Sequence, residues 1–252
     1  MPTAVTLRGL HKSFGTLETI SGIDLDIAEG SFVSVIGPSG CGKSTLLRVV
    51  AGLEPASSGQ AMVYGEPATA ARRRKQVAIV PQHPGLLPWR TVRDNARLLL
   101  DINRKANGST TTDPIELLER VGLTAFLDAH PHELSGGMQQ RVALVRALAL
   151  GAPLLAMDEP LAALDEITRS EMRVLLNQLV EGRGVTTLFV THSISEAVAL
   201  SDRVLVTSPR PARIIADIAI GLPRPRPDDV DDDPQFFELC SRVRHALLEG
   251  AR

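Results

Sequence analysis

The stretch Gly37-Pro-Ser-Gly-Cys-Gly-Lys43-Ser44-Thr45 lies between an apolar run at residues 32–36 and a helix-like segment at residues 46–51. A strand, a glycine-rich loop with the pattern G-x-x-x-x-G-K-[ST] and a helix, in this order, are typical of a phosphate-binding loop (P-loop). Its glycines let backbone N–H groups surround phosphate oxygens, and the helix N-terminus adds a favourable dipole. Lys43 can reach the β- and γ-phosphates, and Ser44 can place its hydroxyl on Mg²⁺.

The stretch therefore predicts an ATP site with Mg²⁺, and the predicted ATP-binding residues of the loop are Gly37, Pro38, Ser39, Gly40, Cys41, Gly42, Lys43, Ser44 and Thr45.

The composition of the chain indicates the cellular compartment and the kinds of partner that suit this site. The 252 residues carry 27 Lys+Arg and 29 Asp+Glu, a net charge of −2, so no basic excess indicates nucleic acid as the main partner. No apolar run approaches the roughly 20 residues of a membrane-spanning helix, and the N-terminus does not resemble a signal peptide. Two cysteines make no disulfide framework. We expect a reduced, cytoplasmic setting, with any membrane association made through a partner.

Alternating strand-like and helix-like segments predict an α/β fold. We expect a P-loop NTPase core with a mainly parallel sheet, an N-terminal antiparallel β subdomain and a helical subdomain insertion. The predicted strands are residues 3–10, 20–27, 33–36, 60–64, 77–80, 154–157, 187–190, 204–207 and 214–220. The predicted helices are residues 92–102, 114–121, 135–150, 167–180 and 236–248.

The predicted domains are a discontinuous nucleotide-binding core (1–86 and 152–222), a helical subdomain (87–151) and a C-terminal linker with a helix (223–252). Residues 223–227 are polyproline-like and residues 228–233 are acidic, which is typical of a solvated linker.

Acidic and imidazole side chains end two of the predicted core strands. Asp158 and Glu159 follow residues 154–157, at the strand end where ligands of α/β sheets bind. We assign Asp158 to the metal, partly through water, and Glu159 to the nucleophilic water. His192 ends a strand expected beside the P-loop and is predicted to contact the γ-phosphate. The alternatives are an ordinary acidic turn and a structural histidine.

A second candidate phosphate surface is Leu134-Ser-Gly-Gly-Met-Gln-Gln-Arg141. Ser135 can cap a helix, and Gly136 and Gly137 would expose backbone N–H groups at its start. One nucleotide cannot easily touch both surfaces of one chain, so a head-to-tail C2 homodimer with two shared nucleotides is one interpretation. The other is a capped helix with a glycine pair.

With these motifs in order, the chain resembles the ATPase subunit of an ABC transporter over roughly residues 3–220. The resemblance implies catalytic roles for Glu159 as general base, His192, Gln82 and Lys43, and metal contacts from Ser44, Gln82 and Asp158. It implies that Phe14 stacks on adenine, whereas residues alone also allow a core aromatic. It further implies that the ATP of the opposite subunit is contacted by Ser135, Gly136, Gly137, Gln139 and Asp165.

Three segments resemble ATPases of nitrate, sulfonate and taurine importers: residues 86–92, 208–214 and 222–226. Trp89 is the only tryptophan, and either an exposed anchor at an interface with a membrane subunit or a buried aromatic fits the sequence. His83 and the pair Ala162-Ala163 depart from the family pattern, yet neither removes a catalytic group.

The resemblance implies an ATP-hydrolysing subunit that works as a homodimer on the cytoplasmic face of the membrane. Its partners would be permease subunits and, indirectly, a solute-binding protein, with no nucleic acid. The alternatives are a soluble ABC-type ATPase of DNA repair or translation, and a nucleotide-gated scaffold without turnover. A P-loop kinase or GTPase would leave residues 134–141 unexplained.

Overall fold

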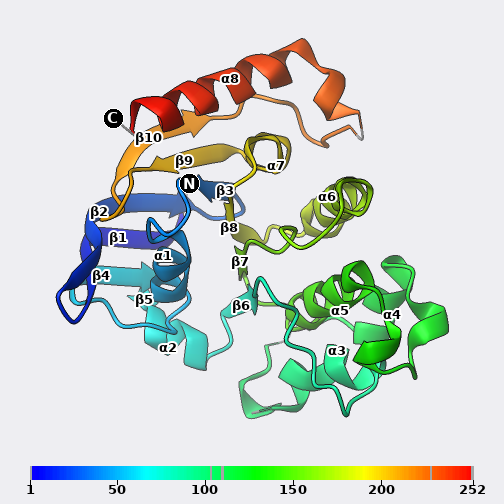
Figure 1. The fold of residues 1–252 in the computed structure, drawn as a ribbon. Helices are drawn as coiled ribbons and strands as arrows, with labels where there is room; N and C mark the ends of the chain where they lie inside the picture. The colour runs from blue at the N-terminus through cyan, green and yellow to red at the C-terminus, as the bar shows by residue number, and fades with distance from the viewer. Residues whose placement is uncertain (1, 103, 109–110, 228, 251–252) are drawn as a thin grey trace.

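Two sheets organise the chain in a computed structural model that describes residues 2–102, 104–108, 111–227 and 229–250 (Figure 1). The first has four strands in the order β2-β1-β4-β5, every neighbouring pair antiparallel. Its strands are β1 (Thr3–Phe14), β2 (Leu17–Ala28), β4 (Ser58–Val63) and β5 (Glu66–Pro67). The N-terminal antiparallel subdomain expected from the sequence is therefore confirmed.

The second sheet has six strands in the order β10-β9-β3-β8-β7-β6. They are β3 (Phe32–Ile36), β6 (Val77–Val80), β7 (Leu154–Asp158), β8 (Thr186–Thr191), β9 (Arg203–Thr207) and β10 (Ile214–Ala219). All neighbours are parallel except β9 and β10. The predicted parallel core is thus confirmed, and β8 lies directly beside the P-loop strand β3, as predicted.

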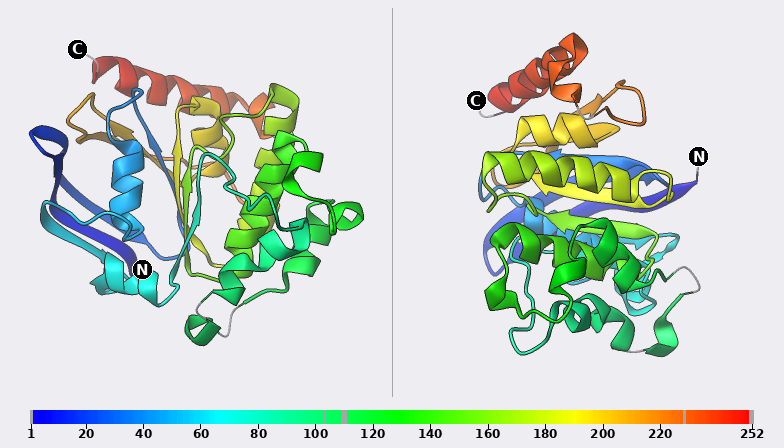
Figure 2. Two further views of the ribbon diagram at one scale, coloured as in Figure 1. Left: turned by 60° about the horizontal axis from the view of Figure 1, so that its bottom comes forward. Right: turned by 90° about the vertical axis from the view of Figure 1, so that its right-hand side faces the viewer.

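The central strands β3 and β8 are buried along their whole length because both faces of this sheet are covered. Alternate residues of β7 illustrate this: Leu154 and Ala156 pack toward helix α1 (Lys43–Val50), while Leu155 and Met157 pack toward the helical lobe. Helix α1 fills the space between the two sheets, and the helical lobe covers the opposite face of the parallel sheet (Figure 2). The short helix α2 (Ala68–Arg73) packs beside α1.

The helical lobe lies between β6 and β7 in the chain, and the predicted helical insertion is confirmed. It contains α3 (Val92–Asp101), α4 (Pro114–Arg120) and α5 (Gly136–Ala149), with short 3₁₀ turns at Arg104–Ala106, Thr124–Phe126 and Pro131–Glu133. Helix α6 (Glu166–Val180) follows β7 and packs against the lobe. Lys75 ties the core to this lobe, because its Nζ donates to Leu99 O and to Asn107 Oδ1, both at 2.6 Å.

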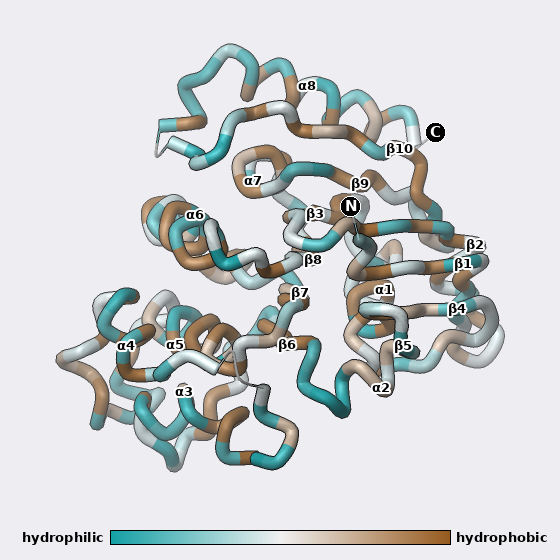
Figure 3. Tube along the Cα trace, turned by 180° about the vertical axis from the view of Figure 1, so that it is seen from behind, coloured by the Kyte–Doolittle hydropathy of each residue, from teal (hydrophilic) through white to brown (hydrophobic). Residues whose placement is uncertain are grey.

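The C-terminal helix packs on the core, whereas most of the described residues of the predicted solvated linker, 223–233, are exposed. Helix α8 (Pro234–Glu249) follows a 3₁₀ turn (Val230–Asp232) and packs with α7 (Ile194–Leu200) over β9. Apolar residues recur along α8 (Figure 3), and Phe236, Leu239 and Val243 are buried against this layer. The first residue of the predicted acidic stretch, Asp228, lies outside the described residues.

One arginine anchors the otherwise exposed proline-rich run to the core. Arg226 is only 6% exposed and donates to the carbonyls of Ala199, Ser201, Leu222 and Pro223. The guanidinium therefore gives these main-chain carbonyls the hydrogen bonds that water would provide in a fully solvated linker.

Replacing Arg226 with alanine is expected to lower the free energy of unfolding by about 2–4 kcal/mol, because four carbonyls lose a charged donor in a buried place. Urea denaturation followed by circular dichroism measures this change. The matched control is Arg242→Ala, which removes an exposed arginine from α8. Equal, small effects of both substitutions would contradict the prediction.

Candidate functional site

The P-loop joins β3 to α1 in a conformation that needs glycine. Gly40 and Gly42 have φ of 70° and 125°, in the region that side chains rarely adopt. At Gly37 the constraint is space, because an added Cβ would lie 2.0 Å from the Thr207 hydroxyl oxygen. Lys43 is 4% exposed, and its Nζ donates to the carbonyls of Gly37 (2.9 Å) and Pro38 (3.0 Å). The loop is therefore curled around its own lysine.

Replacing Gly37 with alanine is expected to displace the P-loop and weaken ADP binding at least about tenfold, because β9 backbone and the Thr207 side chain block the new methyl group. Isothermal titration calorimetry with ADP measures this effect. Thr207→Ala in the same chain removes the nearest blocking atom and should restore part of the affinity. An unchanged affinity in Gly37→Ala would show that the loop tolerates a side chain here.

Two oxygen ligands suited to a magnesium ion meet below the loop. Ser44 lies in the first turn of α1, and its Oγ donates to Asp158 Oδ1, at the end of β7, over 2.7 Å. Gln82, just after β6, has its amide nitrogen 3.4 Å from a carboxylate oxygen of Glu159, the residue that follows Asp158. Hydroxyl, carboxylate and amide oxygens are the hard donors that Mg²⁺ prefers, so this donor set fits the ion.

Three of the predicted catalytic side chains converge at the carboxyl edge of the parallel sheet. Glu159 Oε2 lies 3.4 Å from Gln82 Nε2 and 3.4 Å from His192 Nδ1. The Glu159 backbone has a φ of 45°, and its N–H donates to Val190 O of β8 at 2.9 Å. This strained turn aims the carboxylate along the edge instead of into the sheet. A carboxylate held between an amide and an imidazole can accept a proton from a water molecule.

A cavity of about 280 Å³ extends from the β1–β2 turn to this carboxylate. Its lining residues are Phe14, Leu17, Thr19, Gly40, Gly42, Lys43, Ser44, Thr45, Glu159 and Arg210. Phe14 is 47% exposed, which excludes the alternative that it is a core aromatic. The Lys12 ammonium lies 4.6 Å from the centroid of its ring. The Phe14 ring therefore has Lys12 over one face and remains exposed enough to stack a planar base on the other.

Arg210 borders this cavity but was not among the predicted site residues. Its side chain donates to Gly40 O from Nε (3.0 Å) and Nη2 (2.6 Å). Residues 208–213 contain two arginines, which could have indicated an anion-binding segment. No pattern in the neighbouring sequence, however, indicates that this segment reaches a loop 170 positions earlier. Cys41, on the same loop, is buried with its Sγ 3.2 Å from Thr207 Oγ1, so it has a packing role.

The second predicted phosphate surface lies on the helical lobe, away from this cavity. Ser135 caps α5 by accepting from the Met138 N–H (3.3 Å), as predicted, and Ser135 and Gly136 are exposed. Gly137 is buried, and an added Cβ would lie 2.7 Å from Thr168 Cγ2. Gly137 therefore permits the close approach of α5 to α6, and the expected exposure of its backbone N–H group stays a prediction.

Gln139 and Asp165 also serve their own lobe in this conformation. Gln139 Nε2 donates to Pro131 O at 2.9 Å. Asp165 caps α6 by accepting from the Thr168 N–H at 3.0 Å, and this hydrogen bond lowers the pKa of the Asp165 carboxyl. Asp165 remains exposed beside the free end of α5. A single chain thus brings together the P-loop and the carboxylates, but leaves Ser135, Gly136, Gly137, Gln139 and Asp165 outside the cavity.

The loop between Gln82 and α3 is held rigidly by two buried polar side chains. Arg146 of α5 donates to Pro84 O (2.6 Å) and Gly85 O (2.9 Å), and burial lowers its pKa. Asn95 is fully buried and bonds both the N–H and the C=O of Leu87. Trp89 is nevertheless 73% exposed, so the alternative of a buried aromatic is wrong.

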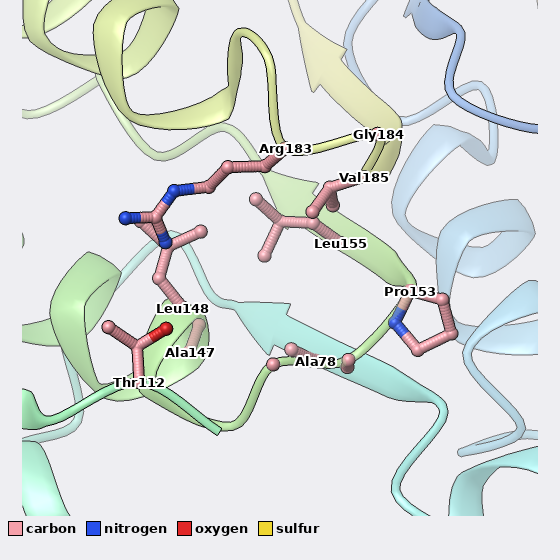
Figure 4. Close-up of a pocket in the computed structure, with 11 residues that line it drawn as sticks. Ala78, Thr112, Ala147, Leu148, Pro153, Leu155, Arg183, Gly184 and Val185 are labelled. Carbon is pink, nitrogen blue, oxygen red and sulfur yellow. The ribbon is translucent and has the colours of Figure 1, made fainter. Parts of the chain in front are cut away.

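A different cavity, of about 430 Å³, lies at the amino-terminal ends of β7 and β8 (Figure 4). Its walls are mainly apolar, from Leu148, Leu155 and Val185, with the Arg183 guanidinium and the Thr112 hydroxyl at one side. Among its described lining residues there is no carboxylate and no part of the P-loop. The reactive groups gather at the opposite strand ends, and we place the functional site there.

Known proteins share this chain's sequence and fold. A family model described as "ABC transporter" matches residues 20–162. The aliphatic sulfonates import ATP-binding protein SsuB of Rhodopseudomonas palustris is 46% identical over 248 residues, covering 98% of this chain and 84% of that protein. The SsuB 1 protein of Agrobacterium fabrum is 41% identical over 245 residues, covering 97% of this chain and 84% of that protein.

Among solved structures, a dimeric post-hydrolysis state of the ATP-binding cassette MJ0796 with ADP and Pi is similar at a TM-score of 0.73 and 31% identity. That match covers 86% of this chain and 98% of the MJ0796 chain. A second dimeric structure of MJ0796, titled a bacterial ABC transporter cassette, has a TM-score of 0.74 at 30% identity, with the same coverage.

Proposed function

Because this chain belongs to the ABC transporter family and is an ABC-type ATPase, we propose that it is the ATP-hydrolysing subunit of an importer for aliphatic sulfonates or similar small organic anions. The observation that carries the proposal is the meeting of Glu159, Gln82 and His192 beside the P-loop, in a chain similar over 98% of its length to a sulfonate import subunit. The relatives favour import over a soluble ATPase of DNA repair or translation.

Each site residue then has a proposed task. Phe14 stacks on adenine, and the loop from Gly37 to Thr45 surrounds the phosphates with its N–H groups and Lys43. Ser44, Asp158 and Gln82 would hold Mg²⁺, which neutralises phosphate charge when bound. Glu159 accepts the proton of the attacking water, and His192 donates to the γ-phosphate. Lys43 must leave the carbonyls of Gly37 and Pro38 to reach the phosphates.

The surface on the lobe supports a homodimer in which each chain completes the other's site. Ser135 and Gly136 are exposed at the N-terminus of a 14-residue helix, and Asp165 is exposed beside them. In a head-to-tail C2 pair these groups, with Gln139, would meet the ATP bound by the opposite P-loop. Gln139 would have to release Pro131 O, and Gly137 would act by letting α5 approach α6.

A membrane permease is the proposed partner for the Trp89 loop. An exposed tryptophan on a rigid loop is a typical interface anchor, and Arg146 links this loop to the helix that begins at Ser135. Within the described part of the chain, no helix is long and apolar enough to cross a bilayer. We propose peripheral attachment to the cytoplasmic face, with a solute-binding protein acting indirectly through the permease.

Uptake and co-purification together test this function. Deleting the gene in the native host should abolish uptake of a radiolabelled alkanesulfonate, and the wild-type gene should restore uptake while Glu159→Gln should not. Tagged protein from gently solubilised membranes should carry a multi-span membrane protein in near-equal amount, and Trp89→Ala should reduce that amount. Uptake that survives the deletion, with capture of ribosomes or DNA, would overturn the transport assignment and leave the ATPase intact.

A further inference from the structure

Arg210 lies in the connection between β9 and β10, whose backbone is fixed against the antiparallel sheet. Ala212 is fully buried; its N–H donates to Thr19 O at 2.9 Å, and its carbonyl accepts from the Ser21 N–H at 3.1 Å. Through these hydrogen bonds, the β9–β10 connection pairs with the outer edge of strand β2. Arg210, two positions earlier, is exposed and reaches over the P-loop to Gly40 O. The fixed backbone therefore holds the exposed guanidinium of Arg210 beside the P-loop.

The position of Arg210 along the cavity defines which part of a nucleotide it would meet. Phe14 and Leu17 of the β1–β2 turn line the cavity, and so do Ser44 in the first turn of α1 and Glu159 just after β7. β2 also borders the P-loop closely, because a Cβ on Gly42 would lie 2.8 Å from Thr19 O. Arg210 enters from this same side. A nucleotide with its base at Phe14 and its terminal phosphate at Ser44 has its first phosphate in between.

We propose that Arg210 is a nucleotide-binding residue that contacts the α-phosphate of ATP or ADP, an inference that rests on the proposed nucleotide site. Guanidinium has five N–H donors, and Gly40 O occupies only one face of this fork. Among the described residues, no carboxylate forms an ion pair with Arg210. An unneutralised cation beside a loop that binds a polyanion is complementary to that ligand.

Two properties follow from a contact at this phosphate. It is independent of the base, so Arg210 would strengthen binding of any nucleoside diphosphate or triphosphate equally. It also persists after hydrolysis, because the α-phosphate is common to ATP and ADP, so Arg210 would slow the release of ADP as well as strengthen the binding of ATP.

Calorimetric titration with ADP, and ligand-observed NMR titration with AMP and adenosine, test the contact. Arg210→Ala should weaken ADP and AMP by the same factor, roughly tenfold, because a charge-assisted hydrogen bond is lost. Adenosine, which has no phosphate, should bind unchanged. Arg210→Lys should keep part of the affinity. The control is Arg213→Ala, which removes an equal charge from the same connection; Arg213 donates to Ser21 Oγ and does not line the cavity.

Salt supplies an independent readout: the loss in Arg210→Ala should shrink between 0.1 M and 0.5 M KCl. Weakening of ADP without weakening of AMP would mean that Arg210 only supports the loop at Gly40, and equal weakening of adenosine would place it at the base or ribose; either result overturns the inference. Wild-type affinities in Arg210→Ala overturn it too, with the nucleotide site intact. A wild-type protein that binds no ADP would instead remove the proposed site itself.

Discussion

Glu159→Gln is expected to hydrolyse ATP about 10²–10⁴-fold more slowly than the wild-type protein, with nearly unchanged nucleotide affinity. Glutamine keeps the size and the hydrogen-bonding reach of the side chain, so the contacts near Gln82 and His192 can persist. It cannot accept a proton from water. Phosphate release at saturating ATP measures the rate, and calorimetry measures the affinity.

The matched control for this change is Glu238→Gln, an exposed glutamate on α8 far along the chain from the site. The Glu159→Gln protein should also accumulate as an ATP-bound dimer in equilibrium sedimentation, because closed pairs would no longer reopen through hydrolysis. A variant that keeps more than about a tenth of the wild-type rate would remove the general-base assignment. A variant that hydrolyses slowly but stays monomeric with ATP would support the general-base assignment and contradict the homodimer proposal.

Lys43→Ala is expected to weaken ATP binding by at least about 100-fold, which equals about 2.7 kcal/mol of binding free energy. Lys43 is the buried cation of the P-loop, and its ammonium is bonded to two loop carbonyls. In the Lys43→Ala variant, the loop would offer no ammonium to the phosphates of ATP. Fluorescence titration with a nucleotide analogue measures the loss. Arg48→Ala, which removes an exposed cation from the same helix, is the control.

A second measurement separates binding from folding in this variant. Without nucleotide, Lys43 satisfies two carbonyls, so alanine should also lower the melting temperature of the nucleotide-free protein modestly. Adding ATP should raise the melting temperature of the wild type and leave that of Lys43→Ala almost unchanged. An equal rise in both proteins would contradict the role assigned to Lys43.

Local patterns predicted most of this architecture. The P-loop, the buried strands and the capped helix after Ser135 follow from neighbours within a few residues, and their bounds agree with the structure to within one or two positions for α3, α4 and α5. Helix α7 was missed, although Ser193 and Glu196 carry a capping-box pattern, because its seven residues are too few to show a helical period clearly.

What failed depends on contacts between distant positions. Most of the proline-rich run is exposed, as its composition predicts, but composition does not predict that Arg226 is buried and bonds carbonyls more than 20 positions away. Arg210 meets Gly40 only within the assembled core, and Gly137 meets Thr168 only when α5 packs on α6. The roles of the site residues toward ATP and a second chain stay predictions until the variants above are measured.

The place of β3 in the sheet has a consequence for how this chain folds during synthesis. Both of its neighbours, β8 and β9, are made about 150 residues later, roughly 10–30 s at the usual speeds of translation. Until then the apolar strand that carries the P-loop has no partner in its sheet, and both of its edges can pair wrongly. High contact order makes such assembly slow. The nascent protein is therefore expected to depend on chaperones, and truncated translation products that end before β8 should aggregate.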